Sequence, residues 1–294
     1  MFIKNMFQKG KHVVSFEVFP PKKEDDVLKL YHTIEDLKSL NPDYVSVTYG
    51  AGGTTRDKSV DIASHIKNHI NLEVVAHLTC VNNTKNDVIN VLDQLKSHNI
   101  KNILALRGDP SQGQTNFTKT IGGFGYAYEL VDFIKDKYDF SVAVAGYPEG
   151  HIETPDLDKD ISYLKMKVEA GADVIITQLF FNNDDFYKFR DIAVKKGINI
   201  PIIPGIFPIL NYKSVQRITS LCGAKIPSNL VSILEKNQDN IEEIEKIGIE
   251  YAIKQLDDLL NTDIEGVHFY SMNKSKEIKE IYNGVKNKIK RIEK

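Results

Sequence analysis

Short apolar runs recur along the chain and alternate with longer, charged segments. Eight of these runs carry few charges and are mostly apolar on both faces, which is typical of buried parallel strands. They occupy residues 13–19, 44–50, 74–80, 102–108, 140–147, 173–181, 200–207 and 266–273. Between them, apolar residues recur at helical spacing. In 25–40 they form one stripe that predicts an amphipathic helix, and 86–99 and 159–172 repeat the pattern.

The spacing of the runs predicts the fold. Seven strand starts follow one another at intervals of roughly 25–40 residues, the size of a β/α unit. The stretch before the eighth run is longer and predicts two or more helical segments, around 211–237 and 240–260. Eight such units in 294 residues favour an α/β fold of the (β/α)8 TIM-barrel type over an open, doubly wound sheet. No Gly/Pro/Ser-rich linker interrupts the chain, so we expect a single barrel domain over residues 1–294.

The composition narrows the class of protein. Of the residues, 41% are hydrophobic and 27% are charged, and the net charge is -2 with both signs mixed, so we expect no nucleic-acid partner. No apolar run approaches the roughly 18 residues that span a bilayer, so no membrane association is expected. The first residues are too charged for a signal sequence. With only Cys80 and Cys222, no disulfide framework is indicated, and we expect a reducing, cytoplasmic setting.

Polar side chains gather at the predicted carboxyl ends of the strands, where the active sites of (β/α)8 barrels lie. They are Glu17, Thr48, Tyr49, His77, Thr79, Arg107, Asp109, Tyr147, Glu149, His151, Thr177, Gln178, His268 and Tyr270. Glu17 lies inside the apolar run "VVSFEVFPP", residues 13–21. Burying an ionised carboxylate there costs several kcal/mol unless it is paired or protonated. The acid is therefore either half of a structural ion pair or a catalytic group.

Other constellations give weaker signals. His65 and His69 are four residues apart on a predicted helix, but no carboxylate or cysteine completes a metal site. The loop "GAGGTT", residues 50–55, fits neither a dinucleotide-binding nor a Walker motif. Lys165 and Lys167 lie on a predicted helix, which argues against a Schiff-base aldolase. The remaining acids, amides, hydroxyls and aromatic rings suit proton transfer beside an organic cofactor.

Nine stretches of the chain resemble, in order, the bacterial methylenetetrahydrofolate reductase family. They are "SFEVFPPK", "YVSVTYGAGG", "AHLTC", "ILALRGDP", "GYPEGH", "LKMKVEAGAD", "ITQLFF", "IIPGIFPI" and "GVHFYSMN". Nine motifs in register along nearly the whole chain are specific where one alone is weak. The resemblance implies a (β/α)8 barrel with non-covalent FAD. The implied activity is reduction of 5,10-methylenetetrahydrofolate to 5-methyltetrahydrofolate with NADH or NADPH, and the implied assembly is a homo-oligomer.

The resemblance also assigns individual residues. Glu17 matches the general acid, Asp109 matches the acid beside the flavin that also contacts folate, and Gln178 matches the amide that meets substrate and nicotinamide in turn. Thr48 matches a residue of the nicotinamide region. The positions that match FAD contacts are Tyr49, Ala51, His77, Arg107, Gly108, Asp109, Tyr126, Ala127, Tyr147, His151, Asp160 and Lys167, of which the cationic Arg107 and Lys167 suit the pyrophosphate.

The chain departs from the family pattern at two substrate positions. Lys274 stands where the family has an arginine, and lysine keeps the charge but lacks the planar bidentate fork. If this position holds the glutamate tail of the folate, the change bears on affinity or tail-length preference. Ser214 replaces a glutamine that contacts folate in the family, and it is a shorter partner.

From these matches we expect a ping-pong reaction in which Glu17, oriented by Thr48, protonates N10 of the folate. The Phe and Val neighbours of Glu17 are expected to raise its pKa, and Asp109 is expected to stay ionised and stabilise the 5-iminium cation. Three other readings stay open. They are another flavin-dependent barrel oxidoreductase, such as a proline-dehydrogenase-like enzyme; a metal-free lyase or aldolase that uses Lys165 or Lys167; and a non-catalytic barrel that binds folate or serves as a scaffold.

Overall fold

The strands form one parallel sheet that closes into a barrel. The computed structural model describes residues 1–49, 53–110 and 117–291, and the sheet order is β7-β6-β5-β4-β3-β2-β1-β9-β8. The strands are β1 (Val13–Val18), β2 (Tyr44–Val47), β3 (Val74–Thr79), β4 (Asn102–Leu106), β5 (Ser141–Gly146), β6 (Val174–Thr177), β7 (Ile202–Ile203), β8 (Gly205–Ile206) and β9 (Gly266–Tyr270). Each lies within one of the eight predicted runs, which confirms the α/β barrel.

The seventh run closes the barrel with two short strands. β7 pairs with β6, β8 pairs with β9, and only Pro204 separates the two. Proline has no amide hydrogen and cannot donate to a strand ladder. Its carbonyl still accepts a hydrogen bond from the backbone N of His268, at 3.0 Å. The run 200–207, predicted as one strand, therefore joins both neighbours in two pieces.

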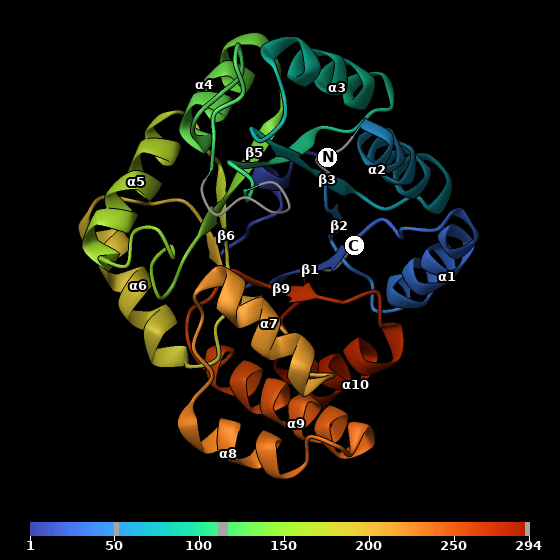
Figure 1. Ribbon diagram of the computed structural model, residues 1–294, viewed down its shortest axis with the longest axis vertical. Helices are drawn as coiled ribbons and strands as arrows, with labels where there is room; N and C mark the ends of the chain where they lie inside the picture. The colour runs from blue at the N-terminus through green and yellow to red at the C-terminus, as the bar shows by residue number, and fades with distance from the viewer. Residues whose placement is uncertain (50–52, 111–116, 292–294) are drawn as a thin grey trace.

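Helices surround the strands as a ring (Figure 1). They are α1 (Val27–Lys38), α2 (Gly53–His65), α3 (Lys85–Ser97), α4 (Ala127–Lys137), α5 (Leu157–Glu169), α6 (Asn183–Lys195), α7 (Tyr212–Cys222), α8 (Ser228–Lys236), α9 (Ile241–Leu259) and α10 (Ser275–Val285). α7, α8 and α9 fill the long stretch before the last strand, as predicted. Within the described ranges, no helix combines the length and the apolar character that crossing a bilayer requires.

Several helices begin at side chains that cap them. Thr84 and Asp87 form a reciprocal capping box at the start of α3. Asp156 and Asn240 accept hydrogen bonds from backbone amides in the first turns of α5 and α9. These caps satisfy amides that have no partner inside the helix, so they fix where the loop before each of these helices ends.

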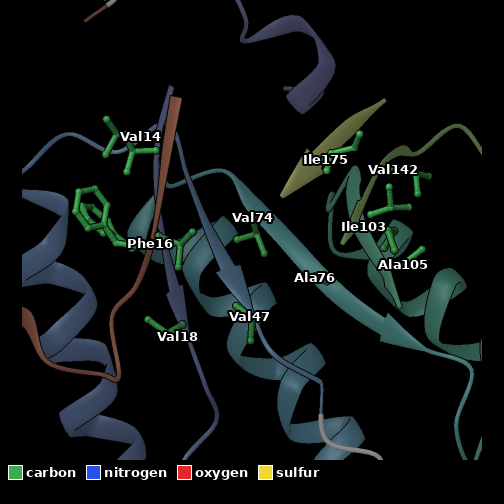
Figure 2. Close-up of a cluster of buried hydrophobic side chains, with 14 of the residues drawn as sticks. Val14, Phe16, Val18, Val47, Val74, Ala76, Ile103, Ala105, Val142 and Ile175 are labelled. Carbon is green, nitrogen blue, oxygen red and sulfur yellow. The ribbon is translucent and has the colours of Figure 1, made fainter. Parts of the chain in front are cut away.

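Alternate strand residues face outward, toward the helices. Val14, Phe16 and Val18 of β1 belong to the same buried cluster as Ile34 and Leu37 of α1. Figure 2 shows this outward set, with Val47, Val74, Ala76, Ile103, Ala105, Val142 and Ile175 from the neighbouring strands. The helix layer is thus attached by the apolar face of each strand.

The inward residues at the amino ends of the strands form a second buried cluster. It contains Val13, Tyr44, Val75, Leu104, Ala143, Val174, Ile176 and Ile203, together with Ile3 and Met6 from the start of the chain. The backbone N of Ile3 donates to Oδ1 of Asn102 at 2.8 Å, and the N of Lys4 donates to the hydroxyl of Ser141 at 3.3 Å. We call residues Ile3 to Met6 the N-terminal plug, because they fill this end of the barrel.

Gly205 provides a test of how the barrel closes. A Cβ atom at this position would lie 2.4 Å from the carbonyl O of Thr177 and 2.7 Å from the ring of Tyr270. We expect Gly205→Ala to lower the free energy of unfolding by about 2 kcal/mol or more, because backbone cannot yield as a side chain can. Urea denaturation measures this.

Gly125→Ala is the matched control. Its added Cβ would lie 3.2 Å from the flexible side chain of Lys119 and 3.6 Å from Oε1 of Glu129, both of which are ends of side chains that can shift. Its stability should stay within about 1 kcal/mol of the parent protein. Equal losses in the two variants would contradict the role given to the contact between Gly205 and Thr177.

Candidate active site

A cavity of about 860 Å³ lies at the carboxyl ends of the strands. The predicted site residues that line it are Glu17, Thr48, Tyr49, His77, Arg107, Gly108, Asp109, Tyr147, His151 and Gln178. A second cavity, of about 430 Å³, shares Arg107, Tyr147 and His151 with the first and is also lined by Tyr126, Ala127, Asp160 and Lys167. We call them the central cavity and the side cavity. Residues scattered over more than a hundred positions are therefore brought together at one end of the barrel.

Glu17 lies between two buried imidazoles at the floor of the central cavity. Its Oε2 is 3.4 Å from Nε2 of His77 and 3.5 Å from Nε2 of His268. The two histidine side chains are 7% and 0% exposed, whereas that of Glu17 is 18% exposed. The carboxylate is thus the most exposed of the three groups; His77 also lines the cavity, and His268 is fully buried.

His268 is oriented from its other side by a serine. The hydroxyl of Ser15, on β1, lies 2.8 Å from Nδ1 of His268, on β9. A hydroxyl can donate or accept, so it can serve either tautomer of the ring. When Ser15 donates, Nε2 carries the hydrogen and can donate it to an ionised Glu17. When Ser15 accepts, Nε2 is bare and can accept from a protonated Glu17.

These contacts decide the charge of the group. Burial alone would raise the pKa of Glu17, but the adjacent imidazoles of His268 and His77 outweigh this effect, so the pKa lies below its usual value. Ser46 acts in the same direction. Burial lowers the pKa of His77 to about 4, so this ring is neutral at pH 7.

The prediction that apolar neighbours surround Glu17 and raise its pKa is wrong. Phe16 and Val18 do not surround the carboxylate, because successive side chains of a strand point to opposite faces. Phe16 and Val18 face the helices (Figure 2). Ser15 and Glu17 face the barrel interior, which contains the imidazoles of His77 and His268. The sequence neighbours of Glu17 are apolar, but its neighbours in space are His77 and His268.

The far wall of the central cavity is held by backbone contacts. The backbone N of Gln178 donates to the carbonyl of Gly146. The side-chain Oε1 of Gln178 accepts from the backbone N of Leu179 at 2.8 Å. The hydroxyl of Tyr270 donates to the carbonyl of Thr177 at 2.7 Å. The side-chain amide nitrogen of Gln178 keeps its donors for a ligand within the cavity it lines.

Strand β4 ends in a turn that admits only glycine. Gly108 has a φ of +86°, and a Cβ there would lie 2.5 Å from Cγ1 of Val81. The turn presents Arg107 to both cavities and Asp109 at the exposed rim. Burial raises the pKa of the Tyr147 hydroxyl, and the charge of Asp109 raises it further, so this group stays protonated.

The side cavity holds cationic groups. Lys167 on α5 donates to the carbonyl of Ala145 at 2.6 Å, and burial lowers its pKa to about 8. Nearby, burial raises the pKa of Asp160 to about 6, although the charge of Lys167 opposes this. Arg107 reaches the same cavity from β4. Two buried cations in a cavity this small suit an anionic ligand.

Two predicted substrate positions lie outside the cavities, and the structure does not describe a third predicted position. Ala51 is outside the described residues. Lys274 is exposed at the N-cap of α10, and Ser214 is exposed in the first turn of α7, where its amide donates to Asn211. Neither Lys274 nor Ser214 is among the described residues that line the two cavities. Their predicted contacts with folate stay predictions.

Comparison with known proteins places the chain in a family. Residues 2–286 match the family model described as methylenetetrahydrofolate reductase. The chain belongs to the methylenetetrahydrofolate reductase family. It is 35% identical over 268 residues to the 5,10-methylenetetrahydrofolate reductase of Escherichia coli K12, covering 90% of this chain and 88% of that protein. It is 42% identical over 285 residues to methylenetetrahydrofolate reductase (NADH) 1 of Arabidopsis thaliana, covering 93% of this chain and 48% of that protein.

The methylenetetrahydrofolate reductase family thus includes longer and shorter chains, and this chain spans about half the length of the plant relatives it matches. A solved structure with the same fold covers 95% of this chain at a TM-score of 0.64 and 17% identity. It is an uncharacterized protein from Clostridium thermocellum that binds two copies of 5-methyl-5,6,7,8-tetrahydrofolic acid. At this identity the likeness concerns the barrel fold alone.

Some members of the site were missed when residues were assigned from the sequence. His268 stands out as a polar residue at a strand end, but its contact with Glu17 was not predicted. Ser15 carries no signal except its place two residues before Glu17, which puts both side chains on the same face of β1. Glu153, which pairs with Arg107, lies in a loop with no recognisable pattern. Strand alternation alone could have indicated Ser15.

Ser15 gives a test of the buried histidine contact. Ser15→Ala leaves Nδ1 of His268 buried without its 2.8 Å partner. We expect a loss of about 1–3 kcal/mol in the free energy of unfolding, because a buried polar atom loses its hydrogen bond. Urea denaturation at pH 7 measures it.

Thr219→Val is the control, since it also removes one buried hydroxyl. That hydroxyl donates to the carbonyls of Val215 and Gln216 in its own helix. Its removal therefore leaves no buried imidazole nitrogen without a hydrogen-bond partner. We expect a change within about 1 kcal/mol. If both variants lose the same stability, Ser15 has no special role in holding His268.

Proposed function

We propose that this protein reduces 5,10-methylenetetrahydrofolate to 5-methyltetrahydrofolate with NADH, using FAD bound in the two cavities. Overall, a hydride from NADH and one proton are added to the substrate, and the bond between the methylene carbon and N10 breaks. The observation that carries the proposal is the position of Glu17: a carboxyl group at the floor of the central cavity, held by two histidines. Membership of the family supports the reaction.

The chemistry of the cavities fits FAD. The side cavity presents Arg107 and Lys167, which suit a pyrophosphate, beside the aromatic rings of Tyr126 and Tyr147. The central cavity adjoins it through Arg107, and its walls carry Leu104, Leu106 and Ala145 as well as polar groups. An elongated ligand with an anionic middle and a flat ring end matches this arrangement. When bound, FAD supplies the carrier that takes hydride from NADH and passes it to the folate.

Glu17 supplies the proton that the folate needs. Protonating N10 releases it from the methylene carbon and leaves a 5-iminium cation, which hydride then reduces. In the structure the pKa of Glu17 lies below its usual value, yet burial is the largest single influence on it and acts upward. Substrate that displaces water from the cavity adds to this effect and favours the protonated acid. The Ser15–His268 pair accommodates both states, because it can present either tautomer to Glu17.

Other groups would orient the reactants and balance charge. Asp109 lies at the rim, where an ionised carboxylate stabilises a cation in the central cavity. Gln178 offers its side-chain amide nitrogen to whichever ligand occupies the part of the central cavity that it lines. This suits a reaction in which NADH and folate bind there in turn. Thr48, at the end of β2, lines the same cavity as Glu17 and orients it or the nicotinamide.

Glu17→Gln is the direct test of the acid. We expect NADH to reduce the bound flavin at a nearly normal rate, whereas oxidation of reduced flavin by methylenetetrahydrofolate slows by about 10²-fold or more. Stopped-flow absorbance of the flavin follows the two half-reactions separately. Glutamine keeps the size and hydrogen bonding of the side chain, so the variant isolates the missing proton.

Glu280→Gln, an exposed change on α10, is the control and should alter neither half-reaction. Equal slowing of both half-reactions in Glu17→Gln would make Glu17 a structural residue. A colourless protein that does not oxidise NADH would favour a non-catalytic barrel. A yellow protein that ignores methylenetetrahydrofolate but oxidises another substrate would favour a different flavin-dependent barrel oxidoreductase.

Lys167 makes the binding of FAD depend on pH. With a pKa of about 8, it loses its proton as the pH rises above that value, and an anionic ligand binds the protonated form better. FAD affinity should therefore change little around pH 7 and fall as the pH rises from about 7.5 toward 9.5, with a slope approaching one proton. Flavin fluorescence titration at several pH values measures it.

Lys167→Met should bind FAD more weakly and abolish this pH dependence. Lys165→Met is the matched control, because Lys165 is on the same helix but exposed, next to Glu169. It should keep the pH profile of the parent protein. A parent profile that is flat from pH 7 to 9.5 would exclude Lys167 as the phosphate-binding cation.

A further inference from the structure

Arg107, just after β4, is held by an acid from the loop that follows the neighbouring strand β5. Its NH1 and NH2 atoms donate to the two carboxylate oxygens of Glu153, at 2.5 and 2.8 Å. This is a two-point, fork-to-fork ion pair, the geometry in which arginine also binds phosphate. Glu153 therefore uses the same two nitrogen atoms that a pyrophosphate would use.

The two partners differ in how firmly they are placed. The side chain of Arg107 is 19% exposed and its guanidinium carbon lies 4.8 Å from the centre of the Phe117 ring, so it is packed in position. The side chain of Glu153 is 43% exposed. A carboxylate half in water can turn away at small cost, since exposed ion pairs contribute about 0–1 kcal/mol, whereas the guanidinium stays where it is.

The loop that carries Glu153 is built to present it. Gly150 has a φ of +83°, which turns the chain after β5, and His151 and Thr154 then pair as an isolated bridge. The backbone N of Glu153 donates to Nδ1 of His151 at 3.1 Å. These contacts hold the backbone of Glu153 at the mouth of the side cavity and leave its side chain free to rotate.

We propose that Glu153 is an internal competitor for the FAD pyrophosphate: it occupies the fork of Arg107 until the cofactor displaces it. The competition holds the guanidinium in its binding orientation and weakens FAD affinity in return. This inference rests on FAD being the ligand of the two cavities, as proposed above. It assigns to Glu153 a positioning role, exerted through Arg107, that sets how readily the protein gains and loses its cofactor.

The experiment compares the dissociation constant of FAD in four proteins: the parent, Glu153→Gln, Glu153→Asp and Asp158→Asn. Flavin fluorescence on dilution of the purified holoprotein gives each constant, and riboflavin, which has no phosphate, is titrated in parallel. Asp158→Asn removes the same charge from the start of α5, where Asp158 pairs with Lys196 and not with Arg107.

We expect Glu153→Gln to bind FAD about 5-fold more tightly or better, because a neutral amide competes poorly for a guanidinium. Glu153→Asp keeps the charge and should remain closer to the parent than Glu153→Gln. Asp158→Asn should lie within about 2-fold of the parent, which excludes a general effect of net charge. Riboflavin affinity should be the same in the parent and Glu153→Gln, since no pyrophosphate is involved.

Unchanged or weaker FAD binding by Glu153→Gln would overturn the inference, because Glu153 would then only support Arg107. An equal gain for FAD and riboflavin would also overturn it, because the effect would not involve the pyrophosphate. A parent protein that binds neither flavin would overturn the proposed cofactor and this inference together. A parent that binds FAD, with no gain in Glu153→Gln, would overturn this inference alone.

Discussion

The two-residue period of the strands, imposed on a closed barrel, is the constraint on which the rest of the structure depends. Each strand must present one face to the helices and the other to the interior. In β1, Val14, Phe16 and Val18 meet the helix layer, while Ser15 and Glu17 point inward. Going from the amino to the carboxyl ends of the strands, the interior changes from an apolar cluster to imidazoles and then to an open cavity. The site is thus the part of the barrel interior at the carboxyl ends of the strands.

Much of the fold is readable in the sequence because buried parallel strands are apolar on both faces and the helices between them are amphipathic. The break of the seventh strand at Pro204 cannot be predicted from the sequence, because it depends on β7 and β8 pairing with different neighbours. The contact between Ser15 and His268 spans 253 residues and follows only from closure of the barrel. The environment of Glu17 was predicted wrongly because its sequence neighbours, Phe16 and Val18, lie on the opposite face of the strand.

The charges of the site are arranged by depth. Two buried imidazoles, those of His77 and His268, lie below the cations, and that of His77 is neutral near pH 7 because burial lowers its pKa to about 4. Lys167 and Arg107 lie nearer to solvent, and Asp109 and Glu153 occupy the outer rim. In the proposed binding of FAD, the anionic middle of the cofactor would displace Glu153, which is half exposed, and reach Arg107, which is packed in position. The family relationship explains which reaction this arrangement would serve, whereas the geometry explains which group would do what.

The N-terminal plug has a consequence for the order in which the molecule assembles. Ile3 is bound by Asn102, 99 residues further on, and Lys4 is bound by Ser141, 137 residues further on. Both partners are synthesised long after Ile3 and Lys4, and closing loops of this length carries an entropic cost. The plug therefore has to wait, unpaired, until β4 and β5 are in place. Residues synthesised well before their partners are thus among the last to find their native contacts.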